Sequence, residues 1–215
     1  MEHERTAGII IGVLVILVIG VLVFGIARTP EIVYKYEGPD GTFDFEREQI
    51  GEVVFQKLTV FAVYDEREQV QHEYYFRNAP DKLEDVSVAG GVKDAILKYR
   101  KQGGSLYITL DPDVDGKIAL GGLILNDVLG RSKGVYKMQI AGGVTSFDGE
   151  DAPVAVINCD NVTENVGIVY LKEDIEQKAF VDGRGCVIIQ GQTPDDIIAT
   201  ADKVAYVMLG VMGEG

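Results

Sequence analysis

Three aspartates stand at alternate positions in the stretch LDPDVDGKI, and a glycine follows them: Asp111, Asp113, Asp115 and Gly116. In an EF-hand calcium loop, the side chains at positions one, three and five supply hard oxygen ligands, and a glycine at position six permits the sharp turn. Counting from Asp111, position twelve, where the loop needs a bidentate glutamate, is Gly122. The stretch therefore carries the first half of a calcium loop and lacks the ligand that closes it.

The same residues have a plainer interpretation as an acidic turn. The residues before Asp111 predict a strand, whereas an EF-hand needs a helix there. Pro112 fixes the bend, and Asp113 or Asp115 caps the helix that follows. We therefore expect no resident cofactor, and calcium binding by Asp111, Asp113 and Asp115 is the alternative.

Other catalytic residue types are scarce. The chain has two histidines, His3 and His72. His72 lies on an alternating strand among aromatic residues, where a structural role is favoured over a catalytic one. The pairs Gly90-Gly91 and Gly121-Gly122 fit neither the Walker A nor the dinucleotide-binding spacing, and close helix packing explains the second pair. We predict that the protein is not an enzyme; a hydrolase that uses carboxylates alone is a weaker alternative.

The two cysteines, Cys159 and Cys186, both lie next to predicted strands. A disulfide between them would join neighbouring strands, which requires an oxidising compartment. The only N-x-S/T site, at Asn161, follows Cys159 directly and would accept a glycan outside the cytosol. The alternative is a pair of buried free thiols and a chance sequon.

Composition limits the partners. The chain has 215 residues, of which 47% are hydrophobic and 25% are charged, as expected for one globular domain with an appendage. Its formal net charge is −14. Nucleic acid is not expected as a partner, because binding it needs lysine and arginine to displace counterions from the phosphates.

An apolar run without charged side chains covers residues 7–27. Twenty-one residues at about 1.5 Å of rise per residue match a bilayer core, which predicts a transmembrane anchor that contacts the lipid bilayer. A signal peptide cleaved before Arg28 is the alternative. Gly8 and Gly12 form a small-xxx-small pair for helix packing in the membrane, so a homo-oligomer is also considered.

The side of the membrane follows from the C-terminal features. Positive charges near the run are almost even, with Arg5 and the free amino terminus before it and Arg28 and Lys35 after it, so they do not decide the orientation. The predicted disulfide and sequon favour an extracytoplasmic domain. We predict a single-pass protein of the cell membrane with a short cytoplasmic N-terminus, residues 1–6.

The rest of the chain predicts the architecture. A juxtamembrane segment covers residues 28–52, and β-branched and aromatic residues predict a β-hairpin over 53–78. From 79 to 215, predicted strands, one of them over 105–110, alternate with helices over 92–102, 116–130 and the segment after Thr193. Thr193 is the expected cap of the last helix, and Pro194 suits its first turn. The expected fold class is α/β: an N-terminal transmembrane helix followed by a β-hairpin and a layered α/β sheet domain, the hairpin being part of that domain or separate.

Four stretches carry a resemblance to known proteins: YYFRNAPDKLEDV, SLYITLDPD, VINCDNVTENVGIVYLKE and CVIIQGQTPDDIIATADKVAYVMLGVM. From Tyr74 to Met212 the chain resembles a family of archaeal, single-span, uncharacterised envelope proteins. The last stretch is also loosely similar to surface-layer protein domains. The resemblance implies a place in the cell envelope and no known activity.

The predicted function is that of a membrane-anchored, extracytoplasmic structural or interaction protein of the cell envelope, with a protein partner there or in a membrane complex. A calcium-dependent binding module is the alternative.

Overall fold

The structure, a computed structural model, describes residues 32–65, 68–149, 152 and 154–215. Contacts group Val33–Gly215 into one compact unit. The predicted transmembrane anchor over residues 7–27, with Gly8 and Gly12, lies outside the described residues.

The predicted fold class is wrong. The described residues form mostly β-sheet, with two sheets and three α-helices. Among these residues, no helix combines the length and the apolar character needed to cross a membrane. The expectation of an α/β domain with a single hairpin overlooked strands in the segment 28–52.

A four-stranded antiparallel sheet, the small sheet, opens the described chain. Its strands are β1 (Ile32–Gly38), β2 (Gly41–Ile50), β3 (Val53–Asp65) and β4 (Glu68–Phe76), in that spatial order. β3 and β4 form the predicted hairpin. β1 and β2 occupy the predicted juxtamembrane segment, where aromatic residues alternate with polar ones in a pattern typical of strands.

The large sheet has seven strands in the order β5-β10-β11-β9-β6-β7-β8. Neighbouring strands are parallel except for the antiparallel pair β10 and β11. The strand bounds are β5 Ser87–Val88, β6 Ser105–Leu110, β7 Gln139–Val144, β8 Ala155–Val156, β9 Val166–Glu173, β10 Lys178–Val181 and β11 Val187–Gly191.

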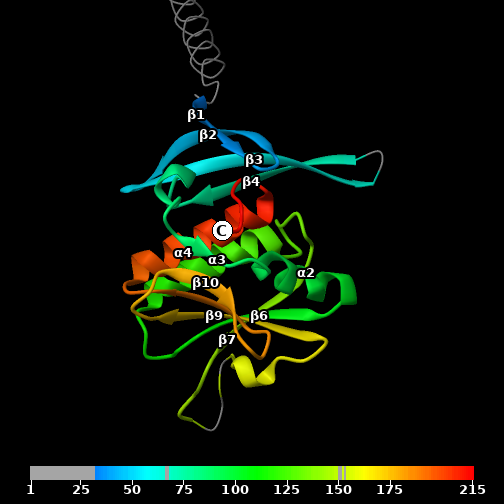
Figure 1. Ribbon diagram of the computed structural model, residues 1–215, viewed down its shortest axis with the longest axis vertical. Coiled ribbons are helices and arrows are strands. Elements are labelled where there is room, and N and C mark those ends of the chain that lie inside the picture. Colours follow the sequence, from blue (N-terminus) through cyan, green and yellow to red (C-terminus); the bar gives the residue numbers. More distant parts are fainter. Residues whose placement is uncertain (1–31, 66–67, 150–151, 153) are drawn as a thin grey trace, which may run out of the picture. The chain divides into compact units, whose positions relative to one another are not determined.

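Three α-helices pack on one face of the large sheet: α2 (Val92–Gln102), α3 (Ala119–Leu129) and α4 (Pro194–Leu209). Figure 1 shows α3 and α4 between the two sheets. The described part of the chain also contains three short 3-10 helices: η1 (Pro80–Lys82), η2 (Gly116–Ile118) and η3 (Cys159–Asn161).

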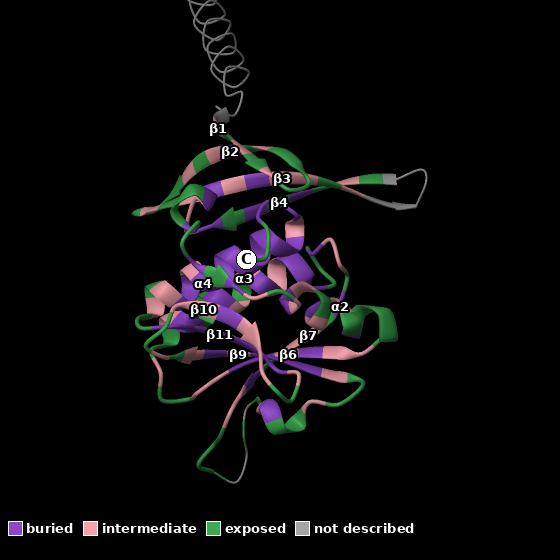
Figure 2. Cartoon of the chain, viewed as in Figure 1, coloured by how far each residue is buried: buried purple, intermediate pink, exposed green. Residues whose placement is uncertain are grey.

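The central helix α4 begins as its sequence predicts. The Thr193 side chain accepts a hydrogen bond from the backbone N–H of Asp196, and Pro194 occupies the first turn. The helix is buried on nearly all sides (Figure 2), since it has a sheet on each side. Toward the small sheet, the Tyr206 ring packs against Phe76, with ring centroids 4.1 Å apart, and against Phe45, at 5.8 Å.

A second, smaller apolar cluster lies on the opposite face of the large sheet. Its buried members are Cys159, Ile168, Cys186 and Ile188. Val187 and Ile189 belong to the main core instead. Because successive side chains of a strand point to opposite faces, β11 contributes to both clusters.

Candidate functional site

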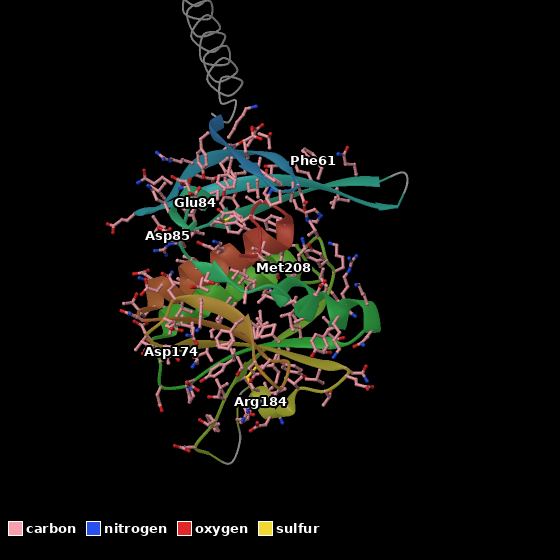
Figure 3. The ribbon with its side chains drawn as sticks, in the orientation of Figure 1. Phe61, Glu84, Asp85, Asp174, Arg184 and Met208 are labelled. Atoms are coloured by element: carbon pink, nitrogen blue, oxygen red, sulfur yellow. A yellow bond between two sulfur atoms is a disulfide. The ribbon has the colours of Figure 1, made fainter. Side chains whose placement is uncertain are left out.

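A groove of about 360 Å³ lies over the smaller apolar cluster, on the face of the large sheet turned away from the helices. We call it the far-face groove. Arg184, at one end of the groove, lies beyond the large sheet in Figure 3. Its lining residues are Thr145, Asn158, Cys159, Asp160, Tyr170, Lys172, Phe180, Asp182, Arg184 and Ile188.

A disulfide builds one wall of the far-face groove. Cys159 and Cys186 are bonded, with sulfur atoms 2.06 Å apart and Cα atoms 5.4 Å apart, so the predicted disulfide is confirmed. Cys159 begins η3, on the connection from β8 to β9, and Cys186 immediately precedes β11. The bond therefore ties this connection to the middle of the large sheet.

Arg184 joins two carboxylates beside that wall. Its Nη1 donates to Asp160 Oδ1 over 2.5 Å, and its Nε donates to Asp182 Oδ2 over 3.0 Å. Burial alone raises the pKa of Asp182, but the backbone N–H groups of Cys186 and Arg184 and the guanidinium outweigh it, so this pKa is lowered. The Asp182 carboxylate is therefore charged at neutral pH and holds the turn in place.

Asp111 lies beside the opposite end of the far-face groove. Its Oδ2 accepts a hydrogen bond of 2.5 Å from the Tyr170 hydroxyl, and its Oδ1 accepts one from the Thr145 hydroxyl. Lys172 pairs with Asp174 at 2.5 Å nearby. These residues come from the carboxyl ends of the adjacent parallel strands β6, β7 and β9, where sheets of this kind commonly bind ligands.

At this end of the far-face groove, the hydrogen bonds of the Tyr170 hydroxyl and of the Asp174 carboxylate shift the pKa of each group. Burial, and after it the hydrogen bond to Asp111, raises the pKa of the Tyr170 hydroxyl. The hydrogen bond to Lys172 is the main cause that lowers the pKa of Asp174. At neutral pH, Tyr170 is thus a hydrogen-bond donor rather than a base.

The far-face groove combines an apolar floor with paired charges. Tyr170, Phe180 and Ile188 form the floor as part of the smaller apolar cluster or packed against it. The charged side chains that line it, Lys172, Asp160, Asp182 and Arg184, already have partners of opposite charge. Asp111, beside the groove, accepts hydrogen bonds from two hydroxyls instead. Such a surface suits a neutral ligand with one apolar face and several hydrogen-bonding groups, since the charges that line the groove already balance one another.

The three aspartates singled out in the sequence are not brought together. Asp111 is bound to the groove hydroxyls, whereas Asp115 Oδ1 accepts a hydrogen bond from the backbone N–H of Lys117 and caps η2. Asp113 is exposed. Over the described ranges, no group of three or more His, Cys, Asp and Glu side chains is arranged to hold a metal ion. Calcium binding by this loop stays a prediction.

The remaining sequence candidates lie in defined places. Asn161 is exposed at the end of η3, and its Oδ1 accepts a hydrogen bond from the backbone N–H of Asn158. Use of the sequon stays a prediction. His72 is 7% exposed, and its Nδ1 donates to the Lys133 carbonyl over 2.6 Å, which is a structural contact.

Sequence reasoning missed most of the far-face groove. It selected Asp111 for its place in an acidic run, but Tyr170, Lys172, Asp182 and Arg184 carry no local pattern that marks a site. The available signal was positional: Asp111 directly follows a predicted parallel strand, and ligand-binding residues gather at such strand ends.

Comparison with models of known protein families, with curated proteins and with solved structures finds no match.

Proposed function

We propose that the protein is a non-catalytic binding module of the cell envelope that acts outside the cytosol, and that the far-face groove binds a neutral, hydroxyl-rich ligand such as a saccharide. The observation that carries this proposal is the combination of an aromatic and aliphatic floor, from Tyr170, Phe180 and Ile188, with end groups whose charges are already paired.

A saccharide matches this combination physically. The C–H face of a sugar ring is apolar and packs on aromatic side chains, while its hydroxyls need donors and acceptors at the rim. Within the described residues, Asp160 Oδ2 and Asn158 Nδ2 make no hydrogen bond. Asp160 Oδ2 can therefore accept a hydrogen bond from a ligand, and Asn158 Nδ2 can donate one. A ligand can use them without disturbing the ion pair of Asp160 with Arg184.

Binding is favoured over catalysis by the state of the acid and base groups. General acid–base catalysis needs a group whose pKa lies near the working pH. The raised pKa of Tyr170 and the engagement of both Asp111 oxygens by hydroxyls point away from proton transfer at this end. These residues orient one another instead.

The disulfide supports the proposed location. Disulfides persist in oxidising compartments and are rare in the cytosol. The exposed position of Asn161 is compatible with a glycan acceptor in the same compartment.

Ligand-observed NMR on the full chain tests the proposed function. We expect saturation transfer to at least one neutral sugar from a panel of monosaccharides and disaccharides. Phe180→Ala should weaken this binding at least fivefold, because it removes part of the floor, and Tyr170→Phe should weaken it less. Phe55→Ala is the matched control, since Phe55 packs against Tyr75 on the small sheet.

Two results would refute the proposal. Equal binding to wild type and Phe180→Ala would place the ligand elsewhere, and conversion of a sugar during the experiment would show an enzyme. A parallel calcium titration addresses the alternative: site-like binding of calcium that is lost in Asp113→Ala would favour the calcium-dependent module.

A further inference from the structure

In the small sheet, β3 extends beyond its neighbour β2. The two strands pair from Ile50 and Val53 to Phe45 and Leu58. After Leu58, β3 continues to Asp65 paired only with β4 among the described strands. Over residues 59–63, the edge of β3 that faces away from β4 is therefore unpaired in the part of the chain that the structure describes.

An open cleft of about 620 Å³ borders this free edge. We call it the edge cleft. Apolar residues from three elements and one loop line it: Phe43, Val60, Phe61, Tyr136, Met208 and Leu209. Phe61 is 60% exposed, which is unusual for a phenylalanine. Figure 3 labels Phe61 on the small sheet and Met208 on α4.

The separation of β2 from β3 is held by contacts at the end of α4. The backbone N–H of Asp40, in the turn before β2, donates to the Gly210 carbonyl over 3.2 Å. A Cβ added at Gly38 would lie 2.1 Å from the Val211 carbonyl oxygen, so the turn packs directly on the chain that follows α4. These contacts hold the start of β2 against the chain that follows α4, away from the edge of β3.

The negative charge around the edge cleft favours a cationic occupant. Asp40 and Asp44 line it, and its one lining lysine, Lys93, donates to the Val207 carbonyl over 3.2 Å. Lys35 contacts Asp44 at 3.5 Å, but both side chains are largely exposed, so this pair is weak. The chain as a whole carries −14 charges. A cationic partner is therefore attracted, whereas a second copy of this chain is repelled.

We propose that the edge cleft binds an extended, cationic segment of a partner protein, which adds to β3 as a strand along residues 59–63. An unpaired strand edge offers alternating N–H and C=O groups that an extended peptide satisfies, and pockets beside the edge select its side chains. Apolar side chains of the segment lie against Tyr136 and Met208, and its basic side chains face Asp40 and Asp44. This proposal is independent of the far-face groove.

Amide hydrogen exchange on the full chain tests the proposal with a synthetic probe, the acetylated and amidated hexapeptide Lys-Val-Lys-Phe-Lys-Val. The probe should slow exchange at least tenfold at those amides of residues 59–63 that face the open edge. A probe N-methylated at alternate backbone nitrogens should give no protection, and one with Glu in place of Lys should bind at least tenfold more weakly.

Two variants locate the site. Phe61→Lys should weaken binding of the probe at least tenfold, since it removes an apolar contact at the mouth of the edge cleft and adds a positive charge that repels the cationic probe. Val54→Lys is the matched control: Val54 is 46% exposed on the same strand, where β3 is paired with β2. The control should bind the probe as wild type does.

Several outcomes would overturn the proposal. Equal affinity for the N-methylated probe would exclude strand addition. Protection that rises with protein concentration in the absence of probe would identify a second copy as the occupant. No protection at millimolar probe, or protection confined to other strands, would exclude this edge as the docking site.

Discussion

Asp202 on α4 is a carboxylate with no exposed surface. Its Oδ2 accepts hydrogen bonds from the backbone N–H and the side-chain Nδ2 of Asn78, over 2.8 and 2.9 Å, while its Oδ1 has no hydrogen-bond partner among the described residues. Burial raises the pKa of Asp202 to about 7, although the Asn78 donors and the charge of Arg77 act in the opposite direction. The acid is thus more easily protonated in the folded chain than in the unfolded one.

The raised pKa predicts how stability changes with pH. Below about pH 4, the Asp202 carboxyl is protonated in both the folded and the unfolded state, so its ionisation does not lower the free energy of unfolding. Between about pH 4 and pH 7, the folded state holds a proton that the unfolded state has released. The free energy of unfolding therefore falls as the pH rises through this range, and it falls no further on account of Asp202 above about pH 7. Asp202→Asn should remove this loss and be the more stable protein at pH 8.

Chemical denaturation of wild type and Asp202→Asn at pH 5 and pH 8 measures this effect. The stability advantage of the variant should grow by about 2 to 4 kcal/mol between the two pH values. Asp113→Asn is the control, since it makes the same charge change on an exposed residue. Parallel pH profiles for wild type and Asp202→Asn would contradict the prediction.

Gly38 marks a second point where one residue decides the packing. Because an added Cβ would meet a backbone oxygen, which cannot move aside as a flexible side chain can, Gly38→Ala should lower the free energy of unfolding by about 1 to 3 kcal/mol. Gly90→Ala is the control, since a Cβ there has no heavy atom within 4 Å. Thermal unfolding compares the two, and an equally small change in both would show that the turn before β2 is free to shift.

At the scale of elements, helix α2 takes its N-terminal cap from the end of the chain. Gly91, the N-cap residue, has no side chain to offer. Instead, the Glu214 carboxylate accepts hydrogen bonds from the backbone N–H groups of Gly91, over 3.0 Å, and Lys93, over 2.7 Å. The backbone N–H of Gly215 donates to the Val88 carbonyl and holds this end beside β5.

Replacing the cap should loosen α2 more than the rest of the fold. Glu214→Ala should lower the free energy of unfolding by about 1 kcal/mol, because it leaves two helix N–H groups without acceptors and removes a negative charge from the positive helix end. Hydrogen exchange should speed up first at the start of α2. Glu164→Ala, an exposed glutamate away from helix ends, should change neither quantity; equal effects of the two substitutions would refute the capping role.

At the scale of the whole molecule, the disulfide closes a sequence separation of 27 residues on the face without helices. Constraining the unfolded chain over a loop of this length is worth about 3 to 4 kcal/mol. We expect Cys159→Ala combined with Cys186→Ala to unfold at correspondingly lower denaturant concentration. A reductant should lower the stability of wild type to that of the double variant and leave the variant unchanged.

The double variant also tests the architecture of the far-face groove. If the bond holds η3 as its wall, amides of residues 158–162 should exchange faster in the variant while α4 keeps its protection. Uniform loss of protection across the chain would show instead that the disulfide supports the entire fold.

The sequence by itself determined the features that depend on neighbouring residues. It predicted α2 and β6 with the bounds that the structure has, and it located the cap of α4 at Thr193. The alternation along β4 also predicted a strand with one buried face, because alternation along a strand is a local property. With two cysteines in the chain, only one internal disulfide pairing was available.

Tertiary structure alone decided the features that join distant segments. β1 and β2 have a local pattern typical of strands, but only the assembled fold joins them to β3 and β4 in a sheet that covers α4. Helix α4 is buried on nearly all sides because a sheet lies on each side of it. Tyr170 meets Asp111 only because β9 lies beside β6. A residue pattern records which face of an element is apolar, but the choice of neighbour is made by packing over the whole chain, so both candidate binding surfaces emerged only from the assembled fold.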